Sequence, residues 1–260
     1  MLCAIGFATA AGKPLRAADI PLRTLVETLF KATPGSRPDF AGRDLSGLDL
    51  SDLDFKGANL AGANLLGANL TGANLTGVNL ARSKLDRAKL TRTKLVNADL
   101  SGASLYHAFG SLSFASAAGD APDFSGADLH GARIMARLPR ANMRGANLAE
   151  ANLGPPDRGN ELKTPQQTDL SGADLTGARL SRARLRRVNL SFADLSNADL
   201  TGADLRGCDL SRANLSGADI AGADFTDAHV YDANLSGVRG LDSAIGLTIA
   251  NAPGRARPSP

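Results

Sequence analysis

The sequence lacks most of the residues on which metal centres and cofactor sites are built. Among its 260 residues there is no tryptophan, and there are only two cysteines and three histidines. Cys3 and Cys208 are too few for a disulfide framework and lack the spacing of a metal site. His107, His130 and His229 lie far apart in the sequence. We therefore predict that the protein holds no metal ion and no cofactor.

Long apolar runs are also missing, since no segment approaches the roughly 18 apolar residues that a membrane-spanning helix requires. We predict no transmembrane segment. The first residues, MLCAIGFATAAGKPLRA, are apolar and contain the Ala-x-Ala pattern of an export cleavage site at residues 8–10, but no basic region precedes them. Export to the periplasm, with a residual signal sequence, and a cytoplasmic location with a plain N-terminus both fit this start.

A period of five residues dominates the rest of the chain. A large apolar residue recurs at every fifth position over residues 40–105, 124–153 and 170–235, and the middle block slips by one residue between Ile134 and Leu138. The members that we take to define the buried core are Leu60, Leu65, Leu70, Leu75, Leu80, Leu175, Leu180, Leu195 and Leu200.

This period excludes both a regular helix and a flat strand. On a helix, five residues turn the side chain by about 500°, so successive leucines would not form a stripe. In a straight strand, an odd period would place successive leucines on opposite faces. The chain must therefore turn a corner within each repeat, and the Ser/Thr-Gly pairs that follow most leucines are residues that favour turns.

The segment ANLAGANLLGANLTGANLTG at residues 58–77 spells out the pattern A(D/N)LXX. In this respect the chain resembles the pentapeptide repeat family over about residues 38–240. The resemblance implies an all-β fold, a right-handed quadrilateral β-helix with four repeats, or twenty residues, in each coil. Two residues before each leucine, a small residue such as Ala63 also points inward, and the Asn or Asp between them points outward.

Three parts follow from the pattern. Residues 1–37 form an N-terminal segment, residues 38–240 form the β-helix, and residues 241–260 form a C-terminal cap and a disordered tail. Loops are expected to interrupt the β-helix near residues 106–122 and 154–167. In the N-terminal segment, an amphipathic helix is expected to cover the apolar end of the stack through Leu22, Leu25, Val26, Leu29 and Phe30.

Charge is close to balance overall, with 29 basic and 26 acidic residues, so its distribution matters more than its sum. The stretch RSKLDRAKLTRTKLV at residues 82–96 should form a basic belt around one coil. Because its charges then face different directions, a flat partner would meet about two of them, which does not favour nucleic acid. Since residues twenty apart stack on one side of the coil, Lys84, Lys89 and Lys94 should lie over Asn64, Asn69 and Asn74. In the same way Arg179 should lie over Asp199 and Arg184 over Asp204, which suggests surface ion pairs. Acidic residues collect instead near the C-terminus, and we take as a candidate interaction surface Asp194, Asp199, Asp204, Asp219 and Asp224.

A rod filled with leucine and alanine offers no cavity in which titratable groups could converge, so we predict that the protein is not an enzyme and has no catalytic residues. The leading hypothesis is a structural or protein-interaction module that displays its faces and loops to an unidentified protein partner. The alternative, implied by the resemblance, is a mimic of duplex DNA that binds DNA gyrase or topoisomerase through the acidic coils. Homodimerisation through an end cap is a further hypothesis.

Overall fold

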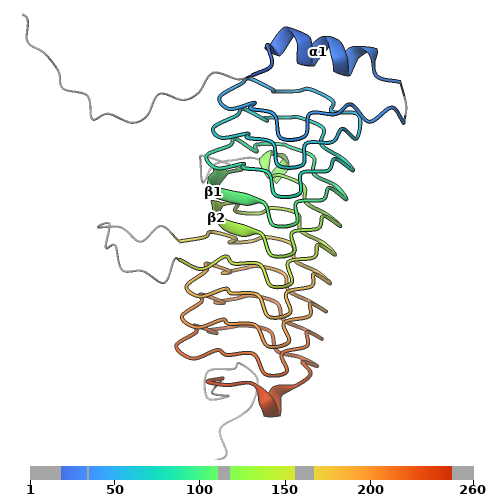
Figure 1. Cartoon of the computed structure of the whole chain (residues 1–260). Helices are drawn as coiled ribbons and strands as arrows, with labels where there is room; N and C mark the ends of the chain where they lie inside the picture. Colours follow the sequence, from blue (N-terminus) through green and yellow to red (C-terminus); the bar gives the residue numbers. More distant parts are fainter. Residues whose placement is uncertain (1–18, 34, 111–117, 156–166, 248–260) are drawn as a thin grey trace, which may run out of the picture.

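The computed structural model describes residues 19–33, 35–110, 118–155 and 167–247. These residues form a long stack of four-sided coils, and one helix, α1, lies across the N-terminal end of the stack (Figure 1). The coiled β architecture and the capping helix that the sequence predicts are therefore confirmed. The candidate export signal lies outside the described residues.

Helix α1 spans Leu22–Lys31 and covers the first coil with a narrow apolar face. Leu25 and Leu29, which are four residues apart and so lie on one face of a helix, are buried. The sequence-based prediction was wrong about Phe30 and Val26, because these side chains are 90% and 37% exposed. Phe30 follows Leu29 directly, and a step of one residue turns a side chain about 100° around the helix and away from the stack.

Each side of a coil is held to its neighbours by a single parallel bridge, and bridged residues are usually twenty apart. Asn64, for example, bridges to Lys84. The Leu65 amide donates to the Lys84 carbonyl at 2.8 Å, and the Lys84 amide donates to the Ala63 carbonyl at 2.9 Å. The backbone groups of inner coils are thus satisfied by the coils on either side, as buried backbone requires.

The corners are tight turns. The Ala63 amide donates to the Leu60 carbonyl at 3.0 Å, which closes a four-residue turn. Gly62, its third residue, has a φ of 66°, the left-handed conformation that a type II turn requires there. The Gly62 amide is free to donate to the next coil, at the Ala81 carbonyl, 2.8 Å away. The Ser/Thr-Gly pairs in the sequence therefore mark the corners.

The interior is a continuous column of leucine and alanine. All nine leucines taken above to define the core are at most 1% exposed. Burial of each such side chain contributes roughly 1.5–3 kcal/mol, so stability is spread over many equivalent contacts along the rod.

The two named strands mark an irregularity in the middle of the stack. Strand β1 spans Ser104–Phe109 and strand β2 spans Arg133–Arg137, and they pair in parallel, side by side in Figure 1. Strand β2 replaces a corner with extended backbone, which explains the one-residue slip in the sequence. The register therefore shifts between Tyr106 and Phe109, where β1 accommodates one more residue than β2.

Insertions lengthen two coils, and the four sides of these coils still stack on the sides of the neighbouring coils. Asp99 bridges to Asp128, and Asn147 bridges to Arg179, so the residues between carry more than one regular coil. The short 3-10 helix η1, Ala118–Asp120, lies in the first insertion. This insertion begins later than the sequence suggested, because Gly110 occupies a buried leucine position, where Pro122 and Leu138 fill the space beside it.

The coil continues for a short distance beyond residue 240. A second 3-10 helix, η2, spans Leu241–Ser243, and Asp224 then bridges to Ile245. Leu241 and Ile245 remain 36% and 56% exposed at this end of the stack.

Candidate interaction surface

The outward residues form four ladders, one on each side of the rod, which we call sides A, B, C and D. In the coil of residues 79–98, the outward residue is Asn79 on side A, Lys84 on side B, Lys89 on side C and Lys94 on side D. Side A continues with Asp99, Asp128, Asn147, Arg179, Asp199, Asp219 and Arg239. Side B continues with Ser104, Arg133, Asn152, Arg184, Asp204 and Asp224. Side C continues with Phe109, Arg137, Asp169, Asn189, Asp209 and His229. Side D continues with Asp123, Asn142, Asp174, Asp194, Asn214 and Asn234.

The aspartates taken as a candidate surface do not share one face. Asp194 lies on side D, Asp199 and Asp219 lie on side A, and Asp204 and Asp224 lie on side B. The structure thus brings four of them together in two pairs on sides A and B, and leaves Asp194 alone on side D.

These carboxylates also have a structural role that the sequence reading missed. Asp194 accepts a hydrogen bond from the Ser196 amide at 2.9 Å, and Asp199 accepts one from the Thr201 amide at 3.0 Å. The side chain therefore caps the corner that follows it. The signal was present, because an Asp or Asn side chain that bonds the backbone two residues ahead is a known turn former.

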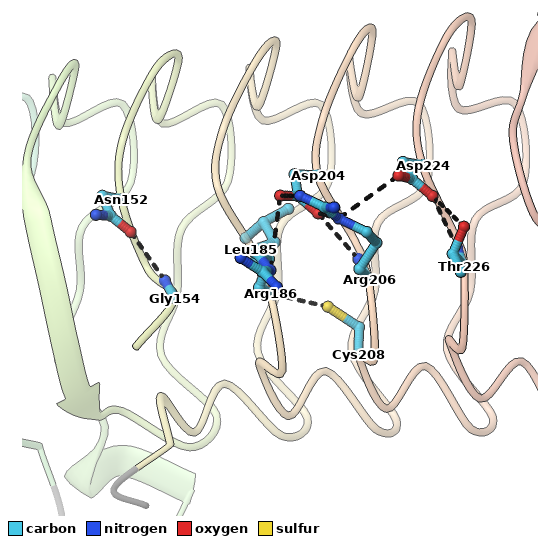
Figure 2. A network of polar contacts seen from close by, with 9 residues as sticks. All are labelled: Asn152, Gly154, Leu185, Arg186, Asp204, Arg206, Cys208, Asp224 and Thr226. Carbon is cyan, nitrogen blue, oxygen red and sulfur yellow. Dashed lines mark hydrogen bonds and ion pairs between the residues drawn. The ribbon is translucent and has the colours of Figure 1, made fainter. Parts of the chain in front are cut away.

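An ion-pair network further engages the aspartates of side B (Figure 2). Arg206 donates from Nε and Nη2 to Asp204 at 2.7 and 2.6 Å, and its Nε lies 3.5 Å from Asp224. Arg186 approaches Asp204 at 3.9 Å. Burial opposes ionisation of Asp204, but the hydrogen bonds and charge of Arg206 outweigh it and hold the pKa of Asp204 below its ordinary value.

The stacking of Arg179 on Asp199 and of Arg184 on Asp204, expected from the twenty-residue coil, is confirmed. The surface ion pairs expected from it are not formed, since neither arginine makes an ion pair with a described residue. The partner of Asp204 is instead the corner residue Arg206, because a corner side chain can fold back onto the side that precedes it.

The basic belt that the sequence predicts is present. Lys84, Lys89 and Lys94 stack on Asn64, Asn69 and Asn74, as predicted. The belt consists of Arg82, Lys84, Arg87, Lys89, Arg92 and Lys94. None of these six makes an ion pair with a residue that the structure describes. The single acid of the stretch, Asp86, is bonded instead to the Ser104 hydroxyl and the Tyr106 amide.

Cys208 occupies the inward small-residue position of its repeat. It is buried, and its Sγ donates to the Leu185 carbonyl at 2.7 Å (Figure 2). Burial raises the pKa of the Cys208 thiol to about 12, so the thiol stays protonated at neutral pH. A buried, protonated thiol is a poor nucleophile.

Two recesses lie on side C and on the corner between sides B and C, and the sequence analysis did not find them. The first has a volume of about 430 Å³ and is lined in part by His107, Phe109, Met135 and Arg137. The second has a volume of about 650 Å³ and is lined in part by Arg186, Arg187, Arg206 and His229. Gln167 lines both, so the recesses adjoin. Both recesses flank the second insertion. The position of this insertion was the one feature of the sequence that could have indicated them.

Within the described ranges, no cluster of three or more His, Cys, Asp and Glu side chains could hold a metal ion. The same ranges contain no helix that is long and apolar enough to span a membrane.

A family model described as Pentapeptide repeats (8 copies) matches residues 39–77, 73–109, 166–202 and 198–237. Together these ranges cover more than half of the chain. No curated protein sequence matches the chain.

Several solved structures are similar to the chain. HetL, a pentapeptide repeat protein involved in heterocyst differentiation regulation in the cyanobacterium Nostoc sp. strain PCC 7120, is 31% identical. The match covers 81% of this chain and 92% of HetL, with a TM-score of 0.42. QnrB1, a plasmid-mediated fluoroquinolone resistance protein, is 20% identical over 75% of this chain and 88% of its own, with a TM-score of 0.47. A pentapeptide repeat protein of the Arabidopsis thaliana thylakoid lumen is 26% identical over 48% of this chain and 71% of its own, with a TM-score of 0.27.

Proposed function

The chain belongs to the pentapeptide repeat family and folds as a right-handed quadrilateral β-helix, and we propose that it is a non-enzymatic interaction module. In this proposal the β-helix of residues 38–240 is a rigid rod, with end segments at residues 1–37 and 241–260. The rod displays its sides and its two insertions to a protein partner.

One observation carries the proposal. Inward positions are almost uniformly leucine or alanine, whereas outward positions change in size and charge from coil to coil on the same backbone. Such a scaffold can vary its surface without disturbing its core, which suits recognition. The buried Cys208 and the corner-capping aspartates have structural roles, so they supply no obvious chemistry.

Affinity capture with the intact chain tests the proposal. The matched control is Leu70→Arg, which places a charge at a fully buried position and should abolish folding. We expect the folded chain, and not the control, to retain a defined protein partner in stoichiometric amount. Turnover of a small substrate that is lost on substitution of one surface residue would overturn the proposal.

DNA mimicry towards gyrase or topoisomerase has less support. A duplex mimic needs carboxylates in register along one surface, whereas the five candidate aspartates are divided among sides A, B and D. Asp204, Asp219 and Asp224 are moreover in ion pairs with arginines of this chain. A gyrase supercoiling assay discriminates the two proposals, because inhibition or protection by micromolar protein would favour mimicry.

Homodimerisation through an end cap remains part of the proposal. The exposed Leu241 and Ile245 at the C-terminal end of the stack support it. Light scattering coupled to gel filtration tests it, with Ile245→Asp as the variant expected to be monomeric. A wild-type chain that is monomeric at all concentrations would remove this part of the proposal and leave the rest intact.

A further inference from the structure

Stacking gathers basic residues from separate coils into one stripe along the rod. We define the basic stripe as side B, side C and the corner between them, over residues 79–198. Among its described residues there are eight bases, Lys84, Arg87, Lys89, Arg133, Arg137, Arg184, Arg186 and Arg187. There are two acids, Asp86 and Asp169. The belt of residues 82–96 is therefore one end of a longer surface.

The opposite half of the same coils has the opposite balance. Side D, side A and the corner between them carry three bases, Lys94, Arg144 and Arg179. They carry five acids, Asp99, Asp123, Asp128, Asp174 and Asp194. The rod is thus positive on one flank and negative on the other, and a charged partner should approach it from a defined direction.

Seven of the eight bases of the stripe make no ion pair with a described residue and are available to a partner. Arg186 is the only one of the eight with an ion pair to a residue in the described part of the chain, and its acceptor is Asp204. Positive charges left without counter-charges attract an anionic partner and gain more from it than charges that are already paired.

The smaller recess lies within this stripe, and the larger recess extends from it towards Arg206, Asp227 and His229. The smaller recess is lined by the apolar residues Phe109, Met135 and Ala136, and by one base, Arg137, and one acid, Asp169. Apolar recesses beside positive charges suit a chain that alternates apolar and acidic side chains, as an extended polypeptide can.

We propose that the basic stripe and its two recesses bind an extended acidic segment of a partner protein, an inference that rests on the proposed interaction function. Side B bases reach from Lys84 to Arg184, four coil steps apart. At about 4.8 Å a step, this distance is about 19 Å, which about six extended residues span.

The arrangement fits a polypeptide better than a nucleic acid. The aromatic residues of the stripe, Tyr106, His107 and Phe109, all lie in β1. A single strand would require a succession of aromatic platforms along the groove. A duplex presents its phosphates on a wide convex surface and would leave the apolar lining of the recess uncovered.

Four arginines provide a matched test. Arg82 and Arg182 lie at the corner between sides A and B, and Arg87 and Arg187 lie at the corner between sides B and C. All four have a φ between 55° and 59°, so glycine fits every position without strain. The double variants Arg87→Gly/Arg187→Gly and Arg82→Gly/Arg182→Gly therefore remove the same charge from the same conformation, and only the first pair lies in the stripe.

The probe is a fluorescent peptide of about eight residues that alternates Glu with Leu, long enough to span the stripe. A Lys-Leu peptide and a labelled DNA duplex serve as controls. Fluorescence anisotropy at low salt should show binding of the Glu-Leu peptide only. Arg87→Gly/Arg187→Gly should weaken it about tenfold, and Arg82→Gly/Arg182→Gly by less than about twofold.

Equal weakening by both double variants would overturn the proposal, as would the absence of binding by the wild-type chain. Tighter binding of the duplex than of the acidic peptide would assign the stripe to nucleic acid instead. Circular dichroism checks that both variants are folded. Failure of this test leaves the proposed interaction function standing, because the capture of a partner by the folded rod does not depend on this probe.

Discussion

The coil of residues 79–98 and the last two full coils, residues 199–238, have the same backbone and the same leucine interior but treat charge in opposite ways. In the first, six bases surround the coil and none pairs with a described residue. In the second, Arg206 pairs with Asp204 and with Asp224 of the next coil, and Arg212 pairs with Asp232 of the next coil. The scaffold therefore accepts either arrangement, and the bases of the first coil are not required by the fold.

The largest expected effect tests whether the two regions have equivalent interiors. Leu90 and Leu210 are both fully buried on side C, one in each region. Leu90→Ala and Leu210→Ala should each lower the free energy of unfolding by about 2–5 kcal/mol, because each leaves a cavity in the column. Chemical denaturation measures both. A large loss in one coil and none in the other would show that the regions differ in more than surface charge.

Removal of one base from each region should lower the free energy of unfolding by different amounts. Arg206→Gln takes the cation away from Asp204 and Asp224, and should cost about 1 kcal/mol, a modest amount because the side chain is 45% exposed. Lys89→Gln removes a base that makes no ion pair with a described residue and should cost much less. Thermal unfolding at low salt measures both, and equal losses would contradict the pairing difference.

Two corner arginines, one in each region, allow the effect of charge pairing to be compared at the same backbone conformation. Arg87 and Arg212 have φ values of 59° and 58°. Arg87→Gly relieves this conformation and should stabilise the chain by up to about 1 kcal/mol. Arg212→Gly should gain about 0.5–1 kcal/mol less, because it loses the contacts with Asp232 at 3.8 Å and with the Phe192 ring at 5.5 Å. Equal changes in unfolding midpoint would show that the Arg212 contacts contribute nothing.

The smallest effect concerns pH. Because the pKa of Asp204 is lowered in the folded protein, its contribution to stability is fully present above its ordinary value of 3.8. It is lost as the pH falls below that value, since the unfolded chain takes up the proton first. Asp204→Asn should therefore flatten the acid side of the stability profile by a few tenths of a kcal/mol. An unchanged profile between pH 5 and pH 2 would contradict the role of the Arg206 contact.

The leucine period predicted a corner in each repeat, and the resemblance to the pentapeptide repeat family supplied the four-sided coil of twenty residues. It also predicted that Lys84 stacks on Asn64, since twenty residues separate them. The exposure of Phe30 was not predictable from helical spacing alone, because that spacing does not say how wide a face the stack can cover.

The basic stripe could not be predicted from the sequence, for a physical reason. Arg133 lies on the same side as Lys84, although an insertion and a nineteen-residue coil make sequence spacing a poor guide here. A fixed count of twenty residues assigns the wrong side to the outward residues between Asp123 and Asn152, which follow Gly110, whose lack of a side chain conceals a repeat. The side of an outward residue follows from the number of repeats before it, not from the number of residues. The repeat that ends at Gly110 cannot be recognised in the sequence and is identified only by its contacts with Pro122 and Leu138.

The lengthened coils have a consequence for how such a rod can acquire new surface. The coil that contains the second insertion closes over thirty-two residues, from Asn147 to Arg179, in place of twenty. The additional loop-closure entropy is about 0.4 kcal/mol, since this cost grows only with the logarithm of loop length. That is less than one buried methylene group contributes. New segments can therefore be added at a corner with little thermodynamic resistance, while every side chain farther along keeps its side of the rod.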